Sequence, residues 1–145
     1  MRVMVLVKAD ESSEAGVMPS PALIAAMMAF NEELAKAGVM VTGDGLRPSS
    51  AGVRVRFSGD SRTVVEGPFA ATRELVAGFW IWEVKDMAEA IAWARRCPNP
   101  QLGESDLEIR PFYTSEDFAG VMDSKVAEQA ARVDATIAER HGKPG

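Results

Sequence analysis

The 145-residue chain has few of the residue types that reactive sites commonly use. It contains one cysteine, Cys97, and one histidine, His141. A single cysteine excludes a disulfide within the chain, and one cysteine with one distant histidine cannot supply the ligands of an ordinary zinc site. Phosphate-cradling glycine loops and haem motifs are also absent from the sequence. It therefore predicts no metal, nucleotide or other cofactor.

Two further absences concern partners and location. With 16 basic and 21 acidic residues the formal charge is −5, and no run of lysine and arginine forms a basic stripe. We therefore expect no nucleic-acid partner. The opening apolar stretch ends at Lys8 and is too short for a signal segment or a membrane span. The sequence thus favours a cytoplasmic protein without a membrane partner.

Apolar periodicity predicts strands and helices in a definite order. Ser20 followed by Pro21 marks the start of one helix, Asp86 with Glu89 predicts a capping box at another, and Pro98 ends it. The expected elements are a strand at 2–8, a helix at 21–37, a strand at 39–41, a turn at 42–45, hairpin strands at 53–57 and 63–66, a strand at 78–84, a helix at 86–97 and a strand at 107–112. This order predicts an α+β fold of the ferredoxin-like, split βαβ type, with both helices on one face of an antiparallel sheet.

A long amphipathic helix is predicted at 114–141, beyond this domain. Its apolar positions recur at helical spacing among charged residues: Phe118, Met122, Val126, Ala130, Val133 and Ile137. We therefore divide the chain into a domain at 1–112 and a C-terminal helical extension at 113–145. The apolar stripe of the extension needs a surface to lie on, either on a partner subunit or on the same domain.

Residues 65–84 carry the most informative pattern, an acidic-Gly-Pro-Phe element at 66–69 that leads through Thr-Arg-Glu at 72–74 to a Gly-Phe-Trp strand. This segment resembles the signature of the YCII superfamily, in the branch named for its Asp-Gly-Pro-Phe motif, with Glu66 in place of the usual aspartate. Further matches lie in the opening strand and at 37–46, 90–94 and 108–111. The resemblance covers residues 1 to about 112 in the same order.

The resemblance implies a subunit whose open sheet face pairs with a second copy, giving a homodimeric α/β barrel with a cleft. Some relatives carry a His–Asp pair associated with acid–base catalysis. The corresponding positions fall near Met27 and Arg96, which cannot do that work. Genes of this branch often lie beside those of extracytoplasmic-function sigma factors. The expected function is a small-molecule pocket protein, which could be a metal-independent enzyme, or alternatively a non-catalytic regulatory or binding module that acts through its dimer surface, linked to stress regulation.

Strand parity indicates the first candidate ligand-binding residues. Glu108 and Arg110 share one parity of the last strand, while Leu107 and Ile109 share the other. The apolar pair should face the helices, so the charged pair should face the open side of the sheet. There Arg110 could bind a carboxylate or phosphate through paired hydrogen bonds. The alternative is a structural ion pair with Glu108.

Loop residues are the next candidates. Asp44, between two glycines at a strand end, is expected at the pocket rim or in an Asx-type turn. The Gly-Pro-Phe segment should fix a bend, with Phe69 filling the core or the mouth of the cleft. Glu66 and Arg73 should flank the pocket or cap the turn at Thr72.

Two tryptophans and the cysteine complete the candidates. Trp80 and Trp82 share one parity of their strand, and we expect them on the open face, as dimer core or as the wall of a ligand pocket. Cys97 lies near two arginines but lacks a histidine partner, so we expect an inert helix-end residue. Whether the protein is an enzyme is left open by these residues.

Overall fold

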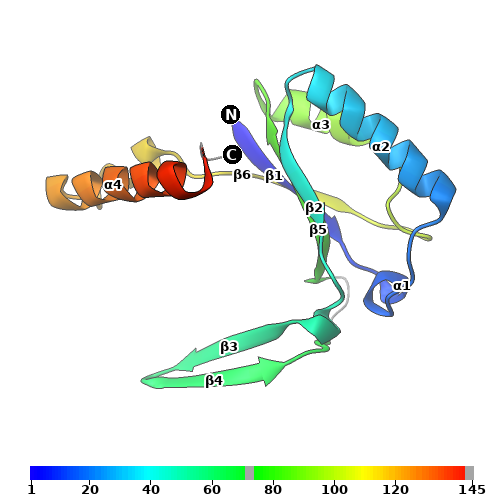
Figure 1. Ribbon diagram of the computed structural model, residues 1–145, viewed down its shortest axis with the longest axis horizontal. Coiled ribbons are helices and arrows are strands. Elements are labelled where there is room, and N and C mark those ends of the chain that lie inside the picture. The colour runs from blue at the N-terminus through cyan, green and yellow to red at the C-terminus, as the bar shows by residue number, and fades with distance from the viewer. Residues whose placement is uncertain (71–73, 143–145) are drawn as a thin grey trace. The chain divides into compact units, whose positions relative to one another are not determined.

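The first unit of the protein is built on a four-stranded antiparallel sheet (Figure 1). The computed structural model describes residues 1–70 and 74–142, and the chain divides into two compact units, Met1–Pro111 and Phe112–Gly145. The strands follow the order β2-β5-β1-β6, with bounds β1 Arg2–Lys8, β2 Met40–Gly45, β5 Val76–Glu83 and β6 Leu107–Pro111. Because β5 separates β1 from β2, and β1 separates β5 from β6, each connecting helix joins strands that are not neighbours. This is consistent with the predicted split βαβ arrangement.

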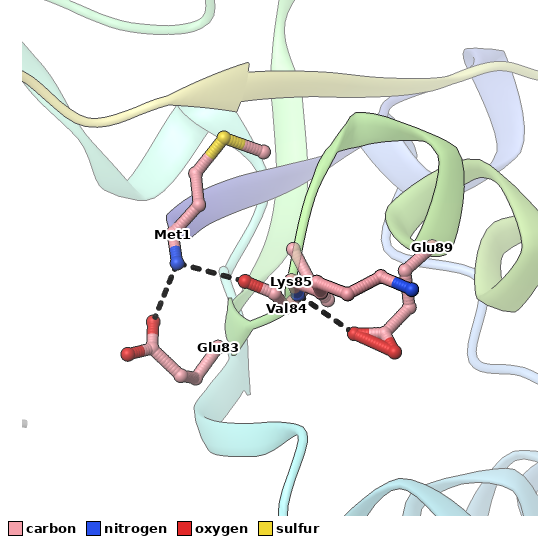
Figure 2. Close-up of polar contacts among 5 residues, drawn as sticks. All are labelled: Met1, Glu83, Val84, Lys85 and Glu89. Atoms are coloured by element: carbon pink, nitrogen blue, oxygen red, sulfur yellow. Dashed lines mark hydrogen bonds and ion pairs between the residues drawn. The ribbon is translucent and has the colours of Figure 1, made fainter.

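Helices α2 (Pro21–Lys36) and α3 (Met87–Arg95) cover one face of this sheet. Ser20 caps α2 as predicted, with Pro21 in its first turn. At α3, Asp86 Oδ1 accepts a hydrogen bond of 2.9 Å from the Glu89 amide. Glu89 Oε1 accepts in turn from the amide of Lys85, one residue before the cap (Figure 2). The predicted cap is therefore present, with its reciprocal bond shifted by one residue.

The residue before β1 contacts the end of β5 through a hydrogen bond and an ion pair. The Met1 ammonium donates to the Val84 carbonyl at 2.7 Å and lies 3.7 Å from Glu83 Oε2 (Figure 2). These contacts extend the antiparallel pairing of β1 and β5, in which Arg2 lies opposite Glu83.

The core lies between the sheet and the two helices. It consists of Val3, Val5, Phe30, Leu34, Val39, Trp80, Trp82, Val84 and Ala90. Trp82 is fully buried and Trp80 is 5% exposed. The Phe30 ring meets both indoles edge-on, with centroids 6.0 and 6.3 Å away.

The prediction that Trp80 and Trp82 lie on the open face is wrong. Cross-strand pairing sets Trp80 opposite Val5 and Trp82 opposite Val3, on the side that the helices cover. There Trp80 Nε1 donates to Asn31 Oδ1 of α2 at 2.8 Å. Both parities of β5 are apolar, so the sequence of this strand could not indicate which one faces the helices.

The segment 42–45, expected as a turn, belongs to β2. Gly43 permits this because it faces Trp80, where a Cβ atom would lie 2.6 Å from the indole Cδ1. The glycine serves packing rather than turning. A short helix, α1 (Glu11–Glu14), also begins where a loop was expected, capped by Asp10.

The predicted hairpin is confirmed and forms a separate two-stranded sheet of β3 (Val53–Ser58) and β4 (Ser61–Glu66). Gly59 adopts a φ of +57° at the turn, as glycine readily does. All residues of both strands are exposed. We call residues 53–66 the arm. A 3₁₀ turn, η1 (Ser49–Ala51), precedes it.

The second unit contains the 3₁₀ turn η3 (Ser115–Phe118) and helix α4 (Ser124–His141). The helix predicted at 114–141 is thus divided into two pieces. Asp123 caps α4, accepting at 2.9 Å from the Val126 amide. In the part of the chain that the structure describes, no helix has the length and apolarity needed to cross a membrane.

Candidate functional site

The sheet face opposite α2 and α3 combines an apolar floor with polar margins. Residues paired across antiparallel strands lie on the same face, so the register defines rows of side chains. One row runs from β2 to β6 through Asp44, Phe79, Leu6 and Glu108, and the next through Thr42, Ile81, Met4 and Arg110. The four apolar side chains in the middle are half-buried. We call this surface the open face, and its four central apolar residues the floor.

Arg110 and Glu108 lie on the open face at the β6 edge, as strand parity predicts. Arg110 Nη1 is 3.9 Å from Glu108 Oε2, and Lys8 Nζ is 3.6 Å from Glu108 Oε1. The Arg110 side chain is 73% exposed, whereas that of Lys8 is 17% exposed. Glu108 therefore has a second, less exposed cation beside it, and most donors of the Arg110 guanidinium face solvent.

Asp44 borders the same floor from the opposite edge. It pairs with Phe79 on β5, and three strand spacings separate it from Glu108, a distance of about 14 Å. The structure therefore does not bring Asp44 to Arg110. A single compact ligand could contact one charged margin together with the floor.

The Gly-Pro-Phe segment forms the bend that its sequence predicts, against η1. A Cβ atom at Gly67 would lie 1.8 Å from the Ser49 carbonyl oxygen, so only glycine fits there. The Gly67 amide donates to the Gly52 carbonyl at 3.0 Å, and the peptide bond to Pro68 is cis. Phe69 lies under the guanidinium of Arg54, whose Cζ is 3.9 Å from the ring centroid, and stays outside the sheet core.

Ser49 connects this bend to helix α1. Its hydroxyl accepts from the Phe69 amide at 3.0 Å and donates to a carboxylate oxygen of Glu14, and its own amide donates to the other Glu14 oxygen at 2.9 Å. Sequence reasoning missed this contact because the two residues are 35 positions apart and neither belongs to a motif. It also missed Lys8, although that residue shares the parity of Met4 and Leu6.

The remaining predicted residues lie elsewhere. Glu66 is exposed at the end of β4, opposite Val53. In the described ranges, no hydrogen bond or ion pair joins Glu66 or Phe69 to the charged pair on β6. Arg73 lies outside the residues that the structure describes. The predicted residues therefore fall into separate groups: the open face, and the bend at the base of the arm.

A hollow of about 820 Å³ opens beside Lys8 at the end of β1. It is lined by Lys8, Ala9, Asp10, Glu11, Ser12, Glu74, Leu102, Gly103, Glu104, Ser105 and Asp106. One ammonium thus faces five carboxylates there. Across residues 1–70 and 74–142, no group of three histidine, cysteine, aspartate or glutamate side chains is arranged to hold a metal ion.

Cys97 and Arg96 take structural positions at the end of α3. Burial raises the pKa of the Cys97 thiol to about 11, so the thiol stays protonated at neutral pH. Arg96 forms an ion pair with Glu33 of α2 and stacks 4.4 Å from the centroid of Trp93. The ion pair with Glu33 links the end of α3 to α2.

Comparison with known proteins gives matches to a family model, a curated protein and a solved structure. The family model of the YCII-related domain matches residues 1–113. An uncharacterized protein of Rhizobium meliloti (strain 1021) is 33% identical over 67 residues, which are 46% of this chain and 54% of the relative, so the chain spans about half the length of that curated relative. Among solved structures, 5-chloro-2-hydroxyhydroquinone dehydrochlorinase from Burkholderia phenoliruptrix AC1100, in complex with 2,5-dihydroxybenzoquinone, matches at 16% identity and a TM-score of 0.45, over 81% of this chain and 98% of that chain.

Proposed function

Because the chain belongs to the YCII-related domain family, we propose that its first unit binds a small anionic molecule with an apolar body on the open face. The observation that carries this proposal is the exposed guanidinium of Arg110 at the margin of the floor. An apolar ring would pack on Met4 and Ile81, the neighbours of Arg110 in its row. Its carboxylate or similar anionic group would accept paired hydrogen bonds from the guanidinium.

The surrounding charges favour this assignment of Arg110. Glu108 has the ammonium of Lys8 at 3.6 Å, closer than the guanidinium at 3.9 Å. An incoming anion can therefore replace Glu108 at Arg110 without leaving that carboxylate unpaired. Leaving a charged group without a partner would otherwise oppose binding.

The open face of one chain can contact a ligand from one side only. Small-molecule sites bury most of the surface of their ligand, and an uncovered apolar face favours association. We therefore propose that the protein acts as a homodimer in which a second copy covers the open face. Light scattering at micromolar concentration should give twice the 15.6 kDa of one chain. A monodisperse monomer would overturn this part of the proposal.

The ligand test uses 1-naphthoate, an aromatic carboxylate, with neutral 1-naphthamide as its matched control. Amide shifts of β1, β5 and β6 in nuclear magnetic resonance spectra should follow the titration with naphthoate. Arg110→Ala should weaken naphthoate binding by about ten- to hundredfold, because it removes a charged hydrogen-bonding partner. Arg95→Ala, an exposed change on α3, should leave the affinity unchanged.

The competing interpretation of Arg110 is a structural pair with Glu108. It requires that Arg110→Ala lower the melting temperature or loosen the dimer while naphthoate binds as before. Equal affinity for naphthoate and naphthamide would also contradict an anion site at Arg110.

A non-catalytic module that acts through its dimer surface is a second candidate, supported by a different observation. The arm carries exposed apolar side chains that lie outside the four-stranded sheet of its own chain. A stable dimer that binds neither probe would favour this function.

A further inference from the structure

The arm is a ribbon with two chemically different faces. One face carries four apolar side chains, Val53, Val55, Phe57 and Val64, with exposed fractions of 59, 48, 69 and 62%, and it is flanked by Arg62 at the tip and Glu66 at the base. The other face carries Arg54, Arg56, Thr63 and Val65. Figure 1 shows the ribbon as a sheet of its own, not joined to the four-stranded sheet.

Such a ribbon lacks what normally stabilises a hairpin. A two-stranded hairpin is at best marginally stable in water unless its apolar face packs on another surface. Its tip is nonetheless shaped by local contacts: the Arg62 guanidinium lies 4.6 Å from the centroid of Phe57 and donates to the carbonyls of Gly59 and Ser61. The arm is thus preformed while its apolar face stays uncovered.

We infer that the apolar face of the arm packs on the open face of a second copy of this chain. Each arm of a two-fold symmetric dimer then covers the floor of its partner. This inference rests on the proposed homodimer and names the element that closes its site. A two-fold axis repeats the contact, so both uncovered apolar surfaces of each chain become buried together.

The charges of the arm and of the open face favour a second copy of this chain as the partner. The arm contains three arginines and two carboxylates, a net charge of +1, so the rest of the −5 chain carries −6. Arg62 lies on the apolar face of the arm, opposite Phe57, whereas Arg54 and Arg56 lie on the other face. On the open face, Glu108 already has Lys8 and Arg110 beside it, whereas Asp44 forms no ion pair within the described residues. The cation at the tip of the apolar face therefore complements the Asp44 margin of a second copy.

Two neighbouring valines of β4 provide a matched test, because they point to opposite faces of the arm. Val64→Glu places a charge in the apolar face, and Val65→Glu places the same charge on the other face. Sedimentation should show that Val64→Glu weakens the dimer by about tenfold or more, while Val65→Glu changes it by less than about threefold. Circular dichroism checks that both variants keep the wild-type fold.

Disulfide trapping tests the position of the arm independently of those variants. All chains carry Cys97→Ser, one also carries Val55→Cys, and the other carries Leu6→Cys. After the two chains are mixed, diamide should oxidise the two thiols to a disulfide and give a covalent heterodimer on a non-reducing gel. Val65→Cys in place of Val55→Cys should give little of this product.

The outcomes separate this inference from the proposed function. A wild-type dimer that resists Val64→Glu and forms no Val55–Leu6 cross-link would overturn the arm contact and leave the dimer standing. A monomeric wild-type chain would overturn both. A dimer weakened equally by Val64→Glu and Val65→Glu would also contradict packing through the apolar face.

Discussion

The four-stranded sheet and the arm are both antiparallel and both carry apolar side chains, yet they end in opposite environments. In β5, Trp80 and Trp82 are 5% and 0% exposed, because α2 and α3 pack over them. In β3, Val55 and Phe57 alternate with arginines and remain 48% and 69% exposed. Alternation therefore tells which side chains share a face, and it does not tell whether anything covers that face.

The bend at Gly67, which lies at the base of the arm, is stabilised differently from both regions. Gly67 fits against Ser49 with no room for a side chain, and Ser49 in turn binds Glu14 and Phe69. The conformation of this bend is fixed by backbone packing and hydrogen bonds, and not by burial of apolar side chains. The sheet, the bend at Gly67 and the partly buried thiol of Cys97 should therefore respond differently to substitution.

Trp82→Ala should have the largest effect. The indole is fully buried against Phe30 and Trp80, so its removal should cost about 3–5 kcal/mol of unfolding free energy. Phe57→Ala on the arm should cost less than about 0.5 kcal/mol in the monomer, because its ring is 69% exposed. Urea unfolding at protein concentrations that disfavour the dimer measures both. Equal losses would contradict the contrast between sheet and arm.

Gly67→Ala should have an intermediate effect. The new methyl group would meet the Ser49 carbonyl oxygen at 1.8 Å, and the forced shift should cost about 1–3 kcal/mol. Gly45→Ala is the matched control, because nothing lies within 4 Å of its Cβ position. Thermal unfolding of both variants checks the difference. If both variants lose the same unfolding free energy, the bend at Gly67 is not tightly packed against Ser49.

The smallest expected effect concerns the reactivity of thiols, which is compared between Cys97 and a cysteine placed on the arm. Burial disfavours the charged thiolate and raises the pKa of Cys97 to about 11, so alkylation by iodoacetamide should be slow at pH 7.5 and rise as the pH approaches that value. A thiol placed on the arm by Val65→Cys, with Cys97→Ser, should react faster at pH 7.5. A rate for Cys97 that levels off below pH 9 would show an unshifted thiol.

Local signals predicted most of the secondary structure. Ser20 and Asp86 begin α2 and α3, and the hairpin turn lies at Gly59, because caps and turns depend on neighbouring residues. The parity of Arg110 and Glu108 was also correct, since only one parity of β6 is apolar. Predictions failed where a local signal was ambiguous: Gly43 indicated a turn, but it makes room for Trp80 in a strand.

By itself the sequence determined the α+β class, the order of the elements and the charged margin at β6, because periodicity and capping are properties of short segments. Tertiary structure alone decided which side of β5 became the core, since both of its parities are apolar and only the pairing of Trp82 with Val3 selects one. Tertiary structure also decided the contact of Glu14 with Ser49, which are distant in sequence. It likewise decided that the arm has no described element of its own chain packed over it. Burial and long-range contact depend on what packs against a segment, and that is not encoded within the segment.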